Sequence, residues 1–137
     1  MHRIWIIVLC LAGAGWAWPA GQKASVPASD VAAVAGEWRG ESLCLVKPSP
    51  CHDEVVVYHV TKAGKAGMLA MQADKIVNGE AQDMGTLDCE YDFGKHTLTC
   101  TIPRGVFRFT VSGDKMEGTL TTSDNVLFRR ISVKKAR

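Results

Sequence analysis

Four cysteines are the residues of this 137-residue chain whose type and spacing point most directly to chemistry. Six residues separate the first pair and ten separate the second, whereas zinc ligands are commonly about two to four residues apart. His52 and Asp53 follow Cys51, but no second cluster has metal-binding spacing. The pattern therefore favours two disulfides and no metal site. The four residues are Cys44, Cys51, Cys89 and Cys100.

The candidates for catalysis lack the context that catalysis needs. The segment Gly40-Glu41-Ser42-Leu43-Cys44 lacks the second glycine of a nucleophile elbow and lies within a strand pattern. His59 lies in an apolar strand run and is expected to be a hydrogen-bonded strand residue rather than a catalytic base. His96 lies beside a turn and is expected to be exposed. The carboxylates of Asp88, Glu90 and Asp92 occupy successive outward positions and are expected to face water rather than calcium. We therefore predict a non-enzyme without metal or cofactor.

The N-terminal segment has the pattern of a bacterial export signal. A positive start, Met1-His2-Arg3, precedes an uncharged apolar run over residues 4–14 and the small-x-small site Gly15-Trp16-Ala17. We place cleavage after Ala17, with Ala20 as the alternative; processing then removes Cys10 and leaves an even number of cysteines. The alternative is a retained membrane anchor, but the apolar run reaches Trp18 at most, near the lower limit of about 17 residues for a spanning helix, and polar Gln22-Lys23 follow soon after. We expect a signal peptide at 1–17, a flexible linker at 18–29, a single domain at 30–137, and a secreted or periplasmic protein.

Composition excludes some partner classes. The 16 basic and 14 acidic side chains are scattered and give a net charge of +2, so no basic stripe for nucleic acid is present. The basic residues after Asp124 fit a last strand and chain end that face solvent. We expect no nucleic-acid partner and no stable membrane span after processing.

From residue 37 onward, apolar and polar residues alternate between turn signals, which is typical of antiparallel strands. Before them, Ser29-Asp30 offers an N-cap for one helical turn over residues 31–35, ended by Gly36. These elements predict an all-β fold, an up-and-down antiparallel β-barrel of about eight strands with one short N-terminal helical turn. The predicted strands are 37–46, 54–62, 67–77, 80–91, 97–102, 105–112, 115–122 and 126–134.

Pairing about each turn fixes which side chains share a face. The hairpin at Gly94-Lys95 places Cys89 opposite Cys100 on its apolar face, which predicts a Cys89–Cys100 disulfide and leaves Cys44–Cys51 to close the loop between them. The same hairpin pairs Leu87 with Ile102 and Tyr91 with Leu98.

The hairpin at Gly113-Asp114 pairs Val111 with Met116, Phe109 with Gly118, and Phe107 with Leu120. A four-residue turn over 103–106 would pair Ile102 with Phe107. A short turn at Ser123-Asp124 would pair Leu120 with Leu127, Gly118 with Arg129, and Met116 with Ile131.

Arg129 is the charged member of this apolar face. Burying a charge alone is costly, so Arg129 needs a partner, and a tryptophan ring is a good platform for a guanidinium. Gly118 would leave room for the side chain, and Trp38 is the candidate platform. The alternative is a register slip of one residue, which would turn Arg129 to solvent and bring Phe128 and Arg130 inside.

A short helical turn, the motif Gly36-Glu37-Trp38, a meander of antiparallel strands and the late-strand Arg129 together resemble the lipocalins of the calycin superfamily. The resemblance implies a lipocalin-like barrel and a small hydrophobic ligand held inside it. The ligand-lining candidates are Tyr91, Phe107, Phe109, Met116 and Leu120. In a chain this short, the same residues would equally serve as a packed core.

Two functions follow from this sequence. The first is an exported, non-catalytic β-barrel that binds a small apolar ligand. The alternative is a protein-binding or inhibitor-type envelope module with a filled barrel, which would act through the loop Leu45–Pro50 closed by Cys44 and Cys51. Two prolines and a disulfide would preorganise that loop and reduce the entropy lost on docking.

Overall fold

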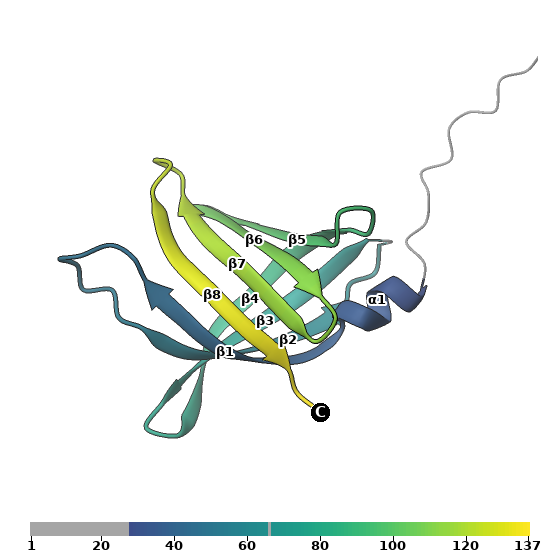
Figure 1. Cartoon of the computed structure of the whole chain (residues 1–137), viewed down its shortest axis with the longest axis horizontal. Helices are drawn as coiled ribbons and strands as arrows, with labels where there is room; N and C mark the ends of the chain where they lie inside the picture. Colours follow the sequence, from purple (N-terminus) through teal and green to yellow (C-terminus); the bar gives the residue numbers. More distant parts are fainter. Residues whose placement is uncertain (1–27, 66) are drawn as a thin grey trace, which may run out of the picture.

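Eight antiparallel strands close into a barrel in chain order, from β1 to β8, with one short helix before them (Figure 1). A computed structural model describes residues 28–65 and 67–137 of the chain. The predicted all-β class and up-and-down order are confirmed. The expected signal peptide at 1–17 and most of the expected linker lie outside the described residues.

The element bounds lie close to the sequence prediction. The strands predicted at 54–62, 97–102, 105–112 and 115–122 are present over those residues. The helix begins at Ala28 rather than at residue 31, so Ser29 and Asp30 lie within it and the linker expected through residue 29 ends earlier. The elements are α1 Ala28–Val34, β1 Gly36–Cys44, β2 Glu54–Lys62, β3 Met68–Val77, β4 Glu80–Asp92, β5 Thr97–Ile102, β6 Gly105–Ser112, β7 Lys115–Thr122 and β8 Leu127–Lys135.

Large apolar side chains fill much of the barrel interior. Strand alternation sends every second side chain inward, and most of the inward ones are apolar. Tyr58 and Phe109 meet edge to face with ring centroids 5.9 Å apart, and the ring of Phe107 stacks beside Phe109. The largest fully buried side chains are Trp38, Phe109, Leu69, Met71, Leu98, Met116 and Ile131.

Both predicted disulfides are present. Cys89 pairs directly with Cys100 across β4 and β5, and both are buried. Cys44 and Cys51 close the loop between β1 and β2. Each bridge restricts the unfolded chain and is expected to stabilise the barrel by about 2–3 kcal/mol.

Two predicted registers are wrong by two residues. The turn between β5 and β6 contains only Pro103 and Arg104, so Ile102 pairs with Gly105 and Phe107 pairs with Cys100. Gly105, the first residue of β6, lets this strand approach β7 closely, because a Cβ there would meet the Thr121 backbone oxygen at 2.5 Å.

The turn between β7 and β8 is longer than expected, with Asn125 at a φ of 66° and a β-bulge after Leu120. The predicted pairs of this hairpin are therefore also wrong. An even shift keeps each side chain on its predicted face, so Arg129 still points inward. The observed pairs are Leu120 with Arg129, Gly118 with Ile131, and Met116 with Val133.

The expected stacking of Arg129 on Trp38 is wrong, because β1 pairs Trp38 with Lys135 and Cys44 with Arg129. Arg129 thus lies six residues along the strand from Trp38. The Lys135 ammonium, not Arg129, stands over the Trp38 ring, 5.5 Å from its centroid. Gly118 makes room for the ring of Phe109 rather than for Arg129, since a Cβ at Gly118 would overlap that ring.

α1 covers the barrel end at which β1 begins and β8 finishes (Figure 1). The Trp38 indole N–H donates to the Val34 carbonyl at 2.8 Å, and Val34 is fully buried. Lys135 Nζ donates to the Ala32 and Ala33 carbonyls at 3.1 and 3.0 Å. These bonds satisfy carbonyls that the last turn of a helix leaves free. We call this the closed end of the barrel.

Double-mutant cycles test the β1–β8 register. Trp38→Leu and Lys135→Met should be non-additive, with a coupling free energy of about 0.5–1 kcal/mol, because each removes half of one cation–π contact. Trp38→Leu and Arg129→Met should add to within about 0.5 kcal/mol, because the two side chains lie far apart. Urea unfolding of the oxidised protein measures both. Coupling in the Arg129 cycle alone would contradict the observed register.

A candidate ligand-binding site at the open end of the barrel

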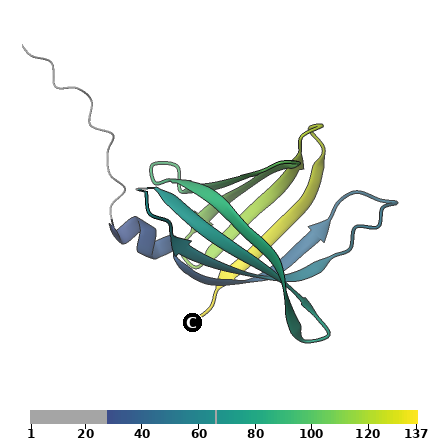
Figure 2. The same ribbon diagram turned by 180° about the vertical axis from the view of Figure 1, so that it is seen from behind.

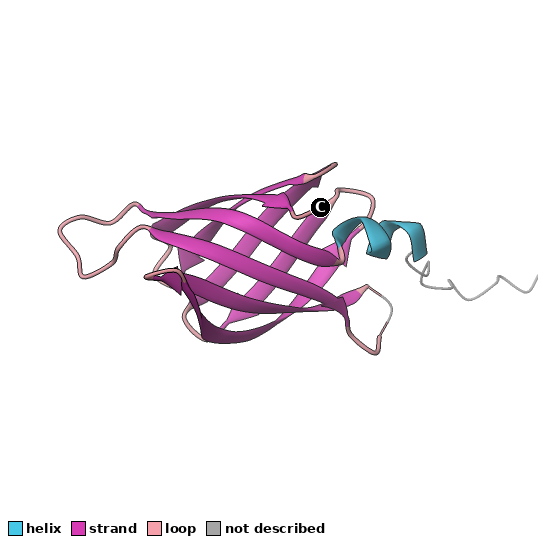
Figure 3. Cartoon of the chain, turned by 90° about the horizontal axis from the view of Figure 1, so that it is seen from below, coloured by secondary structure: helices cyan, strands magenta, loops and turns pink. Residues whose placement is uncertain are grey.

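The opposite end of the barrel is open because β4 separates from β5. The two strands pair only from Cys89 to Asp92, so the first nine residues of β4 have β3 as their strand partner and no pairing to β5. The expected pairing of Leu87 with Ile102 is not formed. The hairpin of β3 and β4 projects from the barrel wall, as seen from both sides in Figures 1 and 2. The loop over residues 45–53 extends from this same end, opposite α1 (Figure 3).

A cavity of about 210 Å³ lies at this open end, and we call it the mouth cavity. It forms where β4 leaves the wall, at a β-bulge that places Met84 out of register and Gly85 at a φ of 109°. Its polar lining residues are Ser42, Glu54, Tyr58 and Arg129. Its other lining residues are Val56, Ala73, Met84, Gly85, Leu87, Ile102, Phe107 and Leu120.

The predicted ligand-lining residues fall into two groups. Phe107 and Leu120 line the mouth cavity. Phe109, Met116 and Tyr91 instead belong to the packed core, with exposed fractions of 1%, 0% and 4%. Three of the five candidates are therefore packed-core residues, and the other two line a cavity.

Arg129 joins three segments at the edge of the mouth cavity. Its Nη1 donates to the Ser42 carbonyl at 3.3 Å, to Ser42 Oγ at 3.2 Å and to the His52 carbonyl at 3.1 Å. The same nitrogen lies 3.5 Å from Glu54 Oε2. The Arg129 side chain is only 13% exposed, so its charge is largely removed from water, and these contacts partly replace the lost hydration. Arg129 therefore ties the base of the disulfide-closed loop to β1 and β2.

Tyr58 brings a hydroxyl to the same cavity from β2. The residue is 3% exposed, and its hydroxyl has no hydrogen-bond partner among the described residues. Burial raises the pKa of Tyr58 well above its ordinary value, although the positive charge of Arg129 lowers it in part. The hydroxyl therefore stays protonated and can donate a hydrogen bond at neutral pH.

Apolar side chains gather around the open end. Seven of the eight exposed large hydrophobic residues lie in loops and strand segments toward the open end, and Phe93 lies in a turn at the closed end. Met84 is the one of the seven that lines the mouth cavity. This uneven distribution favours binding at the open end rather than at the closed end. The seven are Leu43, Leu45, Val55, Val77, Met84, Val126 and Leu127.

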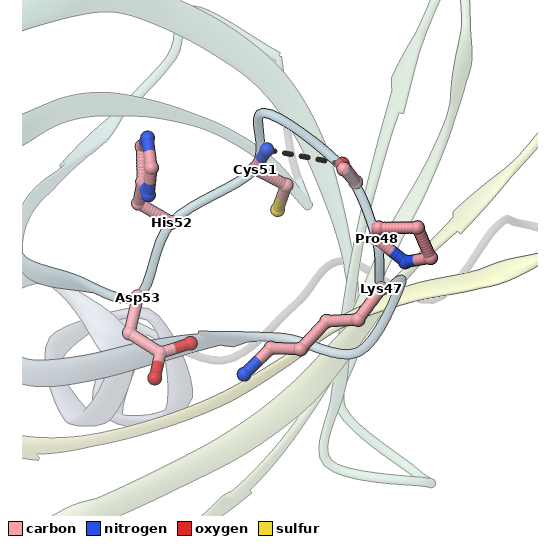
Figure 4. Close-up of a pocket in the computed structure, with 6 residues that line it drawn as sticks. Lys47, Pro48, Cys51, His52 and Asp53 are labelled. Atoms are coloured by element: carbon pink, nitrogen blue, oxygen red, sulfur yellow. Dashed lines mark hydrogen bonds between the residues drawn. The ribbon is translucent and has the colours of Figure 1, made fainter.

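The disulfide-closed loop carries a second, wider depression, shown in Figure 4. Cys51 N donates to Ser49 Oγ at 3.0 Å inside it, and Asp53 accepts a hydrogen bond from Cys44 N at 2.7 Å. The depression is open to solvent, and much of its lining is polar, so it does not enclose a ligand. Lys47, Pro48, Ser49, Cys51, His52 and Asp53 line it.

His59 lies on the outer face of the barrel, away from the mouth cavity. Its Nε2 is 3.2 Å from Asp74 Oδ2, and its Nδ1 is 3.7 Å from Glu37 Oε2. The contacts link β1, β2 and β3, as expected for a hydrogen-bonded strand histidine. Within residues 28–65 and 67–137, no group of three His, Cys, Asp or Glu side chains has an arrangement that would hold a metal ion.

Sequence reasoning missed Glu54, Tyr58 and Ser42 as site residues. The alternation Val56-Tyr58-Val60 already placed Tyr58 on the inner face of its strand. Its position at the open end depends on how β2 pairs with β1 and β3, which the sequence analysis did not assign.

Comparisons with protein-family models and with curated proteins find no match for this chain. Over the part of the chain that the structure describes, no helix has the length and apolar character needed to cross a membrane. Function is therefore inferred from the geometry of the mouth cavity.

Alkaline unfolding tests the environment of Tyr58. Because burial raises its pKa in the folded state, Tyr58 stabilises the fold below about pH 10, and this contribution is lost as the pH rises further. Between pH 8 and pH 11, the wild type should lose about 1 kcal/mol more unfolding free energy than Tyr58→Phe. Urea titrations at both pH values, with both disulfides confirmed by mass, measure the difference. An equal loss in both proteins would show that the hydroxyl is solvated.

Proposed function

We propose that this chain is an exported, non-catalytic binding protein of lipocalin-like architecture, which takes a small apolar ligand into its mouth cavity. The observation that carries the proposal is the position of the cavity. It lies where β4 leaves the barrel wall, is lined mainly by apolar side chains, and opens at the end of the barrel toward which most of the exposed hydrophobic residues lie. A small-molecule site is usually an apolar pocket with a few polar groups that point into it.

The cavity sets the size and affinity of the ligand. Its volume of about 210 Å³ corresponds to about seven water-sized groups, which suits a short alkyl chain rather than a long one. Burying about seven methylene groups would contribute about 5–6 kcal/mol before the cost of association. Because association itself costs free energy, we expect dissociation constants no tighter than about 0.1 millimolar.

Two further features support the proposed setting and role. Two disulfides are typical of an oxidising compartment, and the first 17 residues have the pattern of an export signal. His59 is held between two carboxylates on the outer face, and no histidine of the described residues lines the mouth cavity. These features favour export and binding over catalysis.

A cavity-filling substitution tests the proposal. Ala73 lines the mouth cavity, so Ala73→Leu should fill part of it and weaken octanol binding at least tenfold, as measured by titration calorimetry. Ala70 lies on the same strand but points to the other face, so Ala70→Leu is the matched control and should leave affinity unchanged. Failure of the wild type to bind octanol or any comparable apolar compound would contradict the proposal.

A further inference from the structure

We infer that the ligand of the mouth cavity carries a carboxylate, which the guanidinium of Arg129 and the hydroxyl of Tyr58 recognise. This inference rests on the proposed function, because it assigns the polar end of the same ligand. The apolar lining would hold a short tail, and the two donors would hold the acid group. The ligand class is thus a small amphipathic acid.

Arg129 has donors that the protein does not use. Its contacts to Ser42, His52 and Glu54 all involve Nη1, and neither Nη2 nor Nε donates to another described residue. The Nε–Nη2 edge is one of the edges with which arginine grips a carboxylate through two parallel hydrogen bonds. No sealed side-chain nitrogen lacks a partner among the described residues, so Nε and Nη2 retain accessible surface. A ligand oxygen could bind them there.

Tyr58 supplies an independent second donor. The side chain is 97% buried and lines the mouth cavity, and its hydroxyl has no described partner. No sealed side-chain nitrogen or oxygen lacks a partner among the described residues, so the unpaired Tyr58 oxygen must retain accessible surface. Tyr58 and Arg129 line the same cavity, and the charges of Arg129 and Glu54 both act on the Tyr58 hydroxyl.

The number of donors favours a carboxylate over a neutral group. Nε, Nη2 and the Tyr58 hydroxyl together offer at least three hydrogen bonds, and an ionised carboxylate has about four acceptor positions. A ketone oxygen has two, and an alcohol adds a hydrogen that itself needs an acceptor. A carboxylate is therefore the smallest common group that can engage all three donors.

The carboxylate of Glu54 would weaken binding of an acid, so the direction in which affinity changes when this charge is removed tests the inference. Glu54 and Arg129 are the charged residues that line the cavity, and the Glu54 carboxylate would repel an anionic ligand. Removing that charge should tighten binding of an acid more than binding of a neutral analogue. A purely apolar pocket would not show this difference.

The experiment compares octanoate with octanol, two probes of similar tail length, by titration calorimetry on the purified full chain at neutral pH. Octanoate should bind at least tenfold more tightly than octanol. Tyr58→Phe should weaken octanoate binding about three- to tenfold relative to octanol binding by the same variant, and Glu54→Gln should strengthen it about three- to tenfold relative to octanol.

The arginine variants separate local recognition from overall charge. Arg129→Gln should reduce octanoate affinity at least tenfold. Arg130→Gln removes the same charge from the adjacent, exposed, outward-facing position and should have less than a threefold effect. Since Arg129 also holds the loop base, circular dichroism checks each fold, and Tyr58→Phe tests the inference without changing charge.

The outcomes distinguish this inference from the proposed function. If neither probe binds, the proposed function itself fails. If octanol and octanoate bind equally and the Glu54 and Tyr58 variants change neither, the apolar site stands and the carboxylate assignment is overturned. If octanoate binds more tightly but responds to Arg130 rather than to Arg129, the acid group lies outside the mouth cavity and the assignment is again overturned.

Discussion

The pairing of β1 with β8 is the constraint on which the rest of the structure depends. It closes the barrel and places Trp38 beside Lys135 at one end and Cys44 beside Arg129 at the other. Gly40 lies in the middle of this seam, where a Cβ would overlap the Ser132 carbonyl, so the strands approach closely. One register thus determines both the cap formed with α1 and the position of the charge at the open end.

The two ends use similar residue types for different purposes. At the closed end, a lysine and a tryptophan satisfy carbonyls of α1 and seal the core. At the open end, an arginine joins β1, β2 and the disulfide-closed loop, while β4 leaves the wall and exposes the mouth cavity. The protein therefore combines a packed half that provides stability with an open half that has room for a ligand.

Local patterns predicted the strands and their faces, because alternation and turn residues act over a few positions. Cys89 opposite Cys100 and Phe107 opposite Leu120 follow from single hairpins, and both pairs are present. The partner of Arg129 required the long-range register of β1 against β8, shifted by a bulge and a longer turn, and here prediction was wrong. The mouth cavity likewise depends on the bulge at Met84 and the separation of β4 from β5, which alternation alone does not encode.

The central claim is that the open end of the barrel is a ligand site, and chemical-shift mapping tests it most directly. Octanoate titrated into isotopically labelled protein should shift the backbone amides of residues that line the mouth cavity, such as Tyr58, Met84 and Leu120. The amides around Trp38 and Met116 at the closed end should remain unchanged. Shifts confined to residues 45–53 or to the closed end, or no shifts at ligand concentrations up to about ten millimolar, would contradict the claim.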